Sequence, residues 1–460
     1  MRLRQLFVAG FGLAAGLLIL ALWMTPRITT WAPSDDRIRA RQNISLTANT
    51  PIEEGSIGSH FQSTPPIAGT LGLDGRSVIF DPFEPLEYGS TYTITISPGL
   101  RGENGLSSLS SAQHSFTVQD PELVFMREVD GLTNLWRRDK AGSMTQFSFE
   151  PLGIWEYSIL PDGSGVLVSS LDDDGSEDLV TILSSGERAD VLDCQKHRCR
   201  DARWQPEGAL IAFERSGIEG DGDAAEIWIL DTTTGSVQPA HGSALFSDPV
   251  VDDASSRYPR WSSDGRYLSY YKPNAQSIVV LDMFGDQPQL IPANVDAMGE
   301  WSPSGYQLAF TQLSIDETHD ESFSDLTGEI GEGSSSSISS AVTVADIEAS
   351  NIINLSQGGS YLEGVPEWGP VKGMISSSQI TDGTRQIWTI PLEDGMPEML
   401  TGDPFFNHTS PSWSPDGSRL AFMRSAIGTG GGYAALWLLD PGSGEVFLVA
   451  DDAFVPGWIP

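Results

Sequence analysis

Two acidic stretches hold the residues whose types and spacing could most directly bind a ligand. One reads LDDDGSED and brings Asp172, Asp174 and Asp178 together, and the other reads EGDGDAAE and contains Asp221 and Asp223. Clustered carboxylates can bind calcium, but both stretches lack the twelve-residue calcium loop with its closing bidentate glutamate. We therefore interpret both as solvated turns. A weak calcium site at Asp172, Asp174 and Asp178 is the alternative.

The only two cysteines stand close together in DVLDCQKHRCRDARW. A disulfide between Cys194 and Cys199 would close a short loop and contribute about 2 kcal/mol to stability in an exported chain. A zinc site would need more ligands than two thiols and His197 supply. We expect the disulfide, and free thiols are the alternative.

Catalytic side chains are hard to find in this sequence. The six histidines are scattered over unrelated segments, and no G-x-S-x-G motif marks a nucleophilic serine. A Ser-His-Asp triad or a histidine-based metal centre is therefore poorly supported. We predict no catalytic residue, no metal centre and no cofactor, and hence a protein that is not an enzyme.

Acidic residues dominate the charge of the chain. Its 460 residues include 62 Asp and Glu against 26 Lys and Arg, which gives a formal net charge of −36. Such a surface repels phosphate backbones, so nucleic acid is disfavoured as a partner. The acidity would keep an exported protein soluble. A surface adapted to divalent cations or to a basic partner is the alternative.

The first residues predict where the chain resides. Arg2 and Arg4 precede an uncharged apolar run from Leu6 to Met24, which is long enough to cross a bilayer as a helix. No convincing small-residue cleavage site follows, so we expect residues 1–27 to form a single-pass transmembrane anchor, with a cleaved signal as the alternative. Either way, the bulk of the chain would be extracytoplasmic, and the expected anchor would hold it at the cell membrane.

Turn residues and repeats predict the fold class. The 48 glycines and 29 prolines mark many turns, and helix-forming runs are scarce after the first thirty positions, which predicts an all-β chain. From Leu123 onward the chain repeats itself, with copies such as ARWQPEGALIAFER, PRWSSDGRYLSYYK, GEWSPSGYQLAFTQ and PSWSPDGSRLAFMR. The copies lie about 45 residues apart, which is the size of one four-stranded β-propeller blade.

Most of the tryptophans beyond residue 120 lie at two equivalent positions of the copies, which predicts that they fill the core between blades rather than bind a ligand. The first-strand position holds Trp204, Trp261, Trp301, Trp368, Trp413 and Trp458, and the third-strand position holds Trp136, Trp228, Trp388 and Trp437. The segment after Leu123 lacks a first strand, and the final residues FVPGWIP form a first strand with nothing after it. We expect these two parts to complete one blade. The chain would then close a ring of seven blades, with six as the alternative.

One interval between copies is longer than the others. Between Trp301 and Trp368 the chain is first acidic and then serine-rich, with few residues that could bury area. We expect a mobile, dispensable loop over residues 314–340 on one rim of the propeller.

A smaller β region precedes the repeats. Ser77–Phe80 and Thr91–Ile96 alternate between apolar and polar residues, which predicts half-buried strands. The stretch PLEYGSTYTITI, followed by GLRGENGLSS and HSFTV, resembles the bacterial Ig-like domains of cell-surface proteins. The resemblance covers residues 42–118. It implies a small β-sandwich that serves as a spacer or adhesion module.

The repeat motif W-S-P-D-G-x-x-L-A-F resembles the TolB-type WD40-like propeller repeat, most clearly at Trp301–Phe310 and Trp413–Phe422. The resemblance covers residues 121–460, although TolB propellers commonly have six blades. It implies a protein- or peptide-binding or scaffold module of the cell envelope and carries over no catalytic residues. An enzyme that acts on an envelope glycan or peptide from a propeller face is the alternative.

Overall fold

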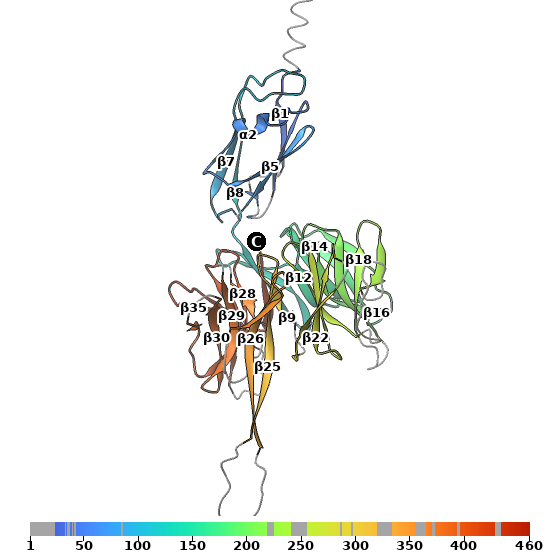
Figure 1. Ribbon diagram of the computed structural model, residues 1–460, viewed down its shortest axis with the longest axis vertical. Helices are drawn as coiled ribbons and strands as arrows, with labels where there is room; N and C mark the ends of the chain where they lie inside the picture. Colours follow the sequence, from blue (N-terminus) through green and yellow to red (C-terminus); the bar gives the residue numbers. More distant parts are fainter. Residues whose placement is uncertain are drawn as a thin grey trace, which may run out of the picture. The chain divides into compact units, whose positions relative to one another are not determined.

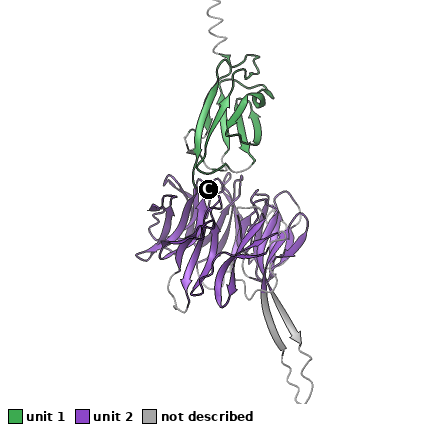
Figure 2. Ribbon diagram, turned by 90° about the vertical axis from the view of Figure 1, so that its left-hand side faces the viewer, with its two compact units in different colours: residues 1–120, 460 green, residues 121–459 purple. Residues whose placement is uncertain are grey.

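The computed structural model describes most of the chain from Met24 to Pro460 (Figure 1). Outside the described residues lie 1–23, 33, 35–36, 39, 41–42, 84–85, 219–224, 241–254, 286–287, 296–297, 320–333, 356–364, 370–372, 393–395 and 428–433. The side chains of Arg37, 314–319 and 334–339 are not described either. Two compact units result, Met1–Asp120 with Pro460 and Pro121–Ile459 (Figure 2).

The described residues are almost entirely strands and turns, so the prediction of an all-β chain is confirmed. None of the described helices is long and apolar enough to span a membrane. The apolar run expected to form the transmembrane anchor lies, except for Met24, outside the described residues.

The first unit is a sandwich of two four-stranded sheets. One sheet has the order β1 (Ile28–Ala32), β3 (Ile44–Ala48), β6 (Ser77–Pro82) and β5 (Gly69–Asp74). The other has the order β2 (Arg37–Ile38), β8 (Ala112–Val118), β7 (Thr91–Ile96) and β4 (Phe61–Thr64), and a short helix, α2 (Ser56–His60), precedes β4. Alternate residues of β6 and β7 point inward, so that Val78, Phe80, Ile94 and Ile96 are buried in one core.

This unit includes residues that precede the expected boundary at 42. Strand β1 pairs with β3. The Asn49 side chain binds the segment before β1 through two hydrogen bonds: its Nδ2 donates to the Thr25 carbonyl at 3.1 Å, and its Oδ1 accepts from the Arg27 amide at 2.7 Å. The side chain of Asn104 donates to the carbonyl of Met24 at 2.8 Å. Residues 24–27, which we assigned to the anchor, therefore pack on the sandwich.

The second unit contains five four-stranded sheets and one eight-stranded sheet in its described part. The eight-stranded sheet comprises β12 (Ile154–Ile159), β13 (Gly165–Leu171), β14 (Glu177–Leu183), β15 (Arg188–Leu192), β16 (His197–Trp204), β17 (Leu210–Gly217), β18 (Glu226–Asp231) and β19 (Ser236–Pro239). Three four-stranded sheets follow the chain order: β20 (Arg257–Trp261), β21 (Tyr267–Lys272), β22 (Ser277–Asp282) and β23 (Gln289–Pro292); β28 (Glu367–Trp368), β29 (Met374–Thr381), β30 (Thr384–Pro391) and β31 (Glu398–Met399); β32 (Phe406–Trp413), β33 (Leu420–Ala426), β34 (Ala435–Leu439) and β35 (Val446–Ala450).

The two ends of this unit share one sheet. Its order is β11 (Met144–Gln146), β10 (Leu132–Arg138), β9 (Glu122–Val129) and β36 (Ala453–Ile459), so the last strand of the chain pairs antiparallel with the first strand of the unit. Trp458 lies opposite Leu123 in this register. The Tyr157 hydroxyl, on β12, lies within hydrogen-bond distance of the carbonyls of Val124 and Val455, at 2.9 and 2.7 Å, and so holds both strands.

The remaining four-stranded sheet departs from the loop that we expected over residues 314–340. Its order is β24 (Glu300–Trp301), β25 (Gln307–His319), β26 (Ser334–Asp346) and β27 (Asn351–Asn354). Strands β25 and β26 pair continuously from Gln307 opposite Asp346 to His319 opposite Ser334. Residues 314–319 and 334–340 are therefore strand rather than loop, and the part between them lies outside the described residues.

The repeated tryptophans connect neighbouring sheets. Each of three indoles donates to the carbonyl of the residue before the preceding tryptophan: Trp261 to Arg203 at 3.0 Å, Trp368 to Glu300 at 2.8 Å and Trp458 to Ser412 at 3.1 Å. Trp301 donates to Ser269 Oγ at 2.8 Å and also lies 3.3 Å from the carbonyl of Arg260. Trp458 is only half-buried, whereas Trp261, Trp301, Trp368 and Trp413 are buried. These positions therefore belong to the core between sheets.

Candidate functional site

The first strands of successive sheets follow one another around the second unit. Strand β12 contacts both β36 and β16, and the series continues from β16 to β20, β24 and β28, while β32 contacts β36. In a propeller such strands surround the central channel. In each first strand, the residue just before the repeated aromatic position is therefore a candidate to face this channel. These residues are Ser158, Arg203, Arg260, Glu300, Glu367, Ser412 and Gly457. We call these seven residues the inner ring.

Bulges in the first strands set the direction of the inner-ring side chains. Two residues before the ring position, Asp201, Tyr258, Ser410 and Val455 have positive φ angles of 46°, 58°, 52° and 50°. In each of these strands the pairing register shifts at that point. Such φ values are uncommon for residues with a Cβ atom, and bulges re-aim side chains. The same local distortion thus recurs at the positions that present the ring.

Two arginines of the ring share one carboxylate. Asp201 Oδ1 lies 2.5 Å from Arg203 Nη2, and Asp201 Oδ2 lies 2.9 Å from Arg260 Nη1. Asp201 is 6% exposed, and the two arginine side chains are 24% and 27% exposed. Burial alone would raise the pKa of Asp201, but the two guanidinium groups hold it below its usual value. Asp201 is therefore an ionised carboxylate that fixes both arginines.

Two glutamates of the ring bind the next sheet. Glu300 Oε2 accepts from the backbone amide of Trp368 at 3.1 Å, and Glu367 Oε1 accepts from the amide of Trp413 at 3.0 Å. Burial raises the pKa of Glu300 to about 7 and that of Glu367 well above its usual range, and the charge of Glu300 raises the latter further. The carboxyl groups of Glu300 and Glu367 therefore bind protons at higher pH than ordinary glutamates do.

Two further carboxyl groups extend this charged cluster. Burial raises the pKa of Glu156, on β12, to about 8, and the neighbouring charge of Asp201 adds to the shift. Burial likewise raises the pKa of Glu214, on β17, to about 7, although the Tyr258 amide donates to its Oε1 at 2.6 Å. Glu156 Oε1 is buried without a hydrogen-bond partner. Strongly shifted carboxyl groups beside fixed arginines are typical of functional sites.

The structure does not assemble a calcium site from the acidic turn. Asp172 Oδ1 accepts from the amide of Asp173, Asp174 Oδ1 accepts from the amide and hydroxyl of Ser176, and Asp178 Oδ1 accepts from the amide of Cys194. Among the described residues, no group of three or more His, Cys, Asp or Glu side chains could hold a metal ion. Asp221 and Asp223 lie outside the described residues.

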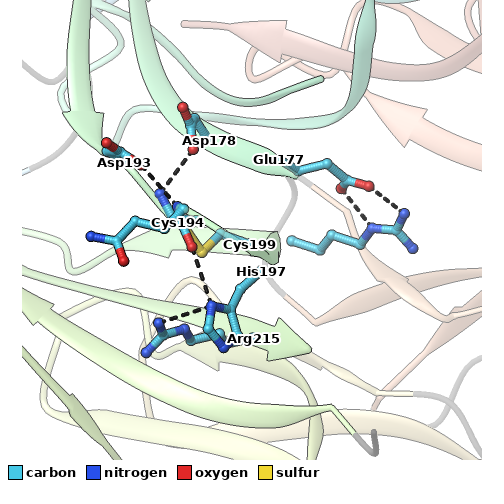
Figure 3. The surroundings of a disulfide bond; sticks show 9 residues. Glu177, Asp178, Asp193, Cys194, His197, Cys199 and Arg215 are labelled. Carbon is cyan, nitrogen blue, oxygen red and sulfur yellow. Dashed lines mark hydrogen bonds and ion pairs between the residues drawn. A yellow bond between two sulfur atoms is a disulfide. The ribbon is translucent and has the colours of Figure 1, made fainter. Parts of the chain in front are cut away.

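Cys194, in the loop after β15, is joined in a disulfide to Cys199 on β16 (Figure 3). Asp178 on β14 accepts from the Cys194 amide at 2.8 Å, and His197 Nδ1 lies 3.3 Å from the Cys194 carbonyl. Arg215 Nη2 lies 3.2 Å from the same His197 nitrogen. His197 thus packs on the loop of the disulfide, and both sulfurs belong to the buried core around Phe213.

Sequence reasoning overlooked the inner ring. The repeat alignment fixed the tryptophans, and the residue before each of them was visible as Arg, Arg, Glu, Glu, Ser and Gly in the same copies. A charged residue beside a core tryptophan in a first strand was the signal that could have found it. Asp201, Glu156 and Glu214 carry no such signal, because the bulges and the contacts between sheets bring them to the ring.

Parts of the chain are similar to a known family and to a known protein. Residues 24–118 match the bacterial Ig-like domain family, so the resemblance inferred for the first unit is confirmed. A 120-residue segment is 31% identical to the uncharacterized peptidase YuxL of Bacillus subtilis (strain 168). This segment is 24% of the present chain, and it covers 17% of the peptidase, so most of that protein has no counterpart in the match.

Solved structures similar to the chain include TolB-type proteins and peptidases. TolB from Acinetobacter baumannii is 13% identical, with a TM-score of 0.42, over 74% of this chain and 66% of that one. A putative TolB from Agrobacterium tumefaciens is 15% identical, with a TM-score of 0.41, over 74% of this chain and 99% of that one. A puromycin-hydrolyzing peptidase of Mycobacterium tuberculosis is 13% identical, with a TM-score of 0.48, over 80% of this chain and 52% of that one.

Proposed function

We propose that this chain is a membrane-anchored, extracytoplasmic β-propeller that binds a protein or peptide of the cell envelope at its inner ring. The Ig-like unit would hold the propeller away from the membrane. The observation that carries the proposal is the charged cluster of the first strands, where Asp201 fixes Arg203 and Arg260 beside the glutamates. Arginine donors and carboxyl groups in one half-buried site can pair with backbone and charged side chains of a ligand.

Seven blades fit the strand pairing best. The eight-stranded sheet divides naturally between β15 and β16, because β14 and β16 are joined only by the parallel pair of Glu177 with Arg198. Each half then has four strands, β12 to β15 and β16 to β19. With the five four-stranded sheets, the propeller would have seven blades, one of them completed by β36.

Binding to envelope proteins tests the proposal. Arg260→Gln removes one positive charge of the ring and keeps a long polar side chain, whereas Arg76→Gln removes an exposed charge from the Ig-like unit. The wild-type chain should retain a specific envelope protein or peptide that Arg76→Gln also retains and that Arg260→Gln loses. Retention by all three proteins, or by none, would argue against the ring as the binding site.

An enzyme acting on an envelope glycan or peptide is the second candidate. One observation favours it: a carboxyl group with a raised pKa, Glu156, lies in the electrostatic field of an ionised carboxylate, Asp201. Hydrolases that cleave glycosidic bonds pair an acid with a carboxylate in this way. Turnover of a glycan or peptide by the purified chain, abolished in Glu156→Gln and Asp201→Asn, would favour the enzyme over the binding module.

The location at the membrane needs a separate measurement. Because Met24, Thr25 and Arg27 pack on the Ig-like unit, deletion should stop before them. Chains that lack residues 1–23 should be released from membranes and keep the melting temperature of the full chain. A truncated chain that remains in the membrane fraction would contradict the anchor.

A further inference from the structure

Five large apolar side chains are exposed on two segments of the second unit that lie against each other. They come from the turn between β9 and β10 and from the segment that leads from β11 into β12. Their exposed fractions are 41% for Val129, 42% for Leu132, 73% for Phe149, 41% for Leu152 and 51% for Trp155. We call this set the Trp155 patch. Contiguous apolar side chains on the surface of a soluble domain mark interaction sites.

The two segments of the patch are locked to each other. Asn134, just after the β9–β10 turn, donates from Nδ2 to the Glu150 carbonyl at 3.2 Å and accepts at Oδ1 from the Glu150 amide at 3.0 Å. A Cβ atom built on Gly153 would lie only 2.9 Å from the carbonyl oxygen of Thr133. Since Gly153 also has a φ of 88°, only glycine fits this close approach. The backbone segments that carry the patch are therefore fixed relative to each other.

The ring of Trp155 packs against the guanidinium group of Arg200. The guanidinium carbon of Arg200 lies 3.8 Å from the centre of the Trp155 ring. Arg200 Nε and Nη2 also donate to the two carboxylate oxygens of Glu177 at 2.6 and 2.5 Å, so the arginine has little freedom. An aromatic side chain that is ordered before binding loses less entropy when a partner covers it.

Carboxylates border the patch. The amide of Leu171 donates to the carbonyl of Gly153 at 3.2 Å, which places the β13–β14 turn next to Leu152. Asp172, Asp173 and Asp174 of that turn are exposed, and so is Asp130 at the tip of the β9–β10 turn. Neither turn contains a lysine or an arginine. The two turns that border the patch are therefore negative. The cations beside them are already engaged, because Arg198 and Arg200 pair with Glu177 and Lys196 acts on Asp174.

We infer that the Trp155 patch, with its acidic border, docks a polypeptide segment of a partner protein that presents apolar side chains flanked by lysine or arginine. This inference rests on the proposed binding function and adds a surface distinct from the inner ring. Apolar contact would supply the affinity at Phe149 and Trp155, and the aspartates would select the basic flanks. An anionic membrane surface would be repelled by the same carboxylates.

Two synthetic peptides of equal length and charge test the inference on the full chain. One alternates lysine with leucine and the other alternates lysine with serine. The lysine–leucine peptide should bind, and Trp155→Ala should weaken this binding at least about tenfold, as loss of an aromatic anchor does. Phe284→Ala removes an aromatic side chain that is 86% exposed in the turn after β22 and should leave the affinity unchanged. Equal binding of the two peptides would overturn the inference.

Charge variants separate the acidic border from the net charge of the protein. Asp172→Asn, Asp173→Asn and Asp174→Asn together keep the oxygen acceptors of the turn and remove three charges. The matched control combines Glu187→Gln, Glu445→Gln and Asp451→Asn, which are exposed elsewhere. The first triple variant should weaken binding several-fold more than the second, and equal losses would overturn the inference. The patch and the proposed function can fail separately. If Trp155→Ala binds the lysine–leucine peptide as tightly as wild type while Arg260→Gln loses the envelope ligand, the patch is refuted and the proposed function is not.

Discussion

At the residue scale, the protein concentrates shifted pKa values in one cluster. Glu156, Glu214, Glu300 and Glu367 hold their protons to higher pH than free glutamates do, and burial is the main cause in each case. A group whose folded pKa lies above its unfolded value stabilises the fold fully below the unfolded pKa, and this stabilisation is lost as the pH rises through the folded pKa. The cluster should therefore favour the folded state at mildly acidic pH.

Glu300→Gln tests this dependence at one residue. The glutamine can still accept from the Trp368 amide but has no proton to lose, so the variant should be less destabilised than wild type as the pH rises from about 5 to about 8. We expect a difference in melting temperature on the order of a few degrees at pH 8 and little difference at pH 5. Parallel melting curves at the two pH values, in both proteins, would contradict the role of burial.

A control is needed because another group acts in the opposite direction. Burial, aided by Arg424, lowers the pKa of His408 to about 4. The folded state therefore becomes less stable as the pH falls from the unfolded pKa of about 6.5 towards the folded pKa. Only the difference between variant and wild type isolates Glu300. The exposed substitution Glu445→Gln should not change the pH dependence.

The disulfide gives a second prediction at this scale. A non-reduced digest of the full chain should contain the peptides of Cys194 and Cys199 linked to each other, as mass spectrometry would show. The paired Cys194→Ser and Cys199→Ser variant should lose about 2 kcal/mol, because the closed loop is short. Two free thiols in protein isolated from its native compartment would contradict the pairing.

At the element scale, five first-strand tryptophans join two sheets, because the indole of each donates a hydrogen bond to the preceding sheet: Trp261, Trp301, Trp368, Trp413 and Trp458. Trp301 is buried, stacks on Tyr267 with ring centres 5.6 Å apart, and donates to Ser269 on the preceding sheet. Trp301→Ala should cost about 3–5 kcal/mol because it opens a cavity between the sheets. Trp301→Phe keeps much of the volume and should cost less, since it removes mainly the hydrogen bond. Chemical unfolding measures both, and equal costs would show that packing contributes little.

Sequence reasoning located the elements well where a physical pattern fixed them. Thr91–Ile96 alternates in the sequence and is β7 with the same bounds, and the W-S-P-D-G copies mark real first strands and turns. It was wrong where composition misled, because serines in residues 334–340 suggested a loop, whereas pairing with β25 makes them a strand. The inner ring was unpredictable in detail, since it depends on bulges at positions such as Asp201 that no periodicity reveals.

At the scale of the whole molecule, one strand joins the two ends of the second unit. Strand β36 supplies the fourth strand of the first sheet and is held by Tyr157 as well as by its pairing with β9. Deletion of residues 454–460 should expose the edge of β9 and lower the melting temperature by more than Trp458→Ala does, with aggregation. An unchanged melting temperature would contradict closure by this strand.

The central claim is that the inner ring is a binding site, and site-specific photo-crosslinking tests this claim most directly. Ser412→Cys places a thiol at a small, neutral ring position, and Ser443→Cys places one on an exposed turn between β34 and β35. Because the native cysteines are bonded to each other, a thiol-linked photo-crosslinker reports on the new site alone. We predict a discrete cross-linked envelope protein or peptide from position 412, absent from position 443 and lost when Arg260→Gln is added. The same products from both positions, or none from position 412, would contradict the account.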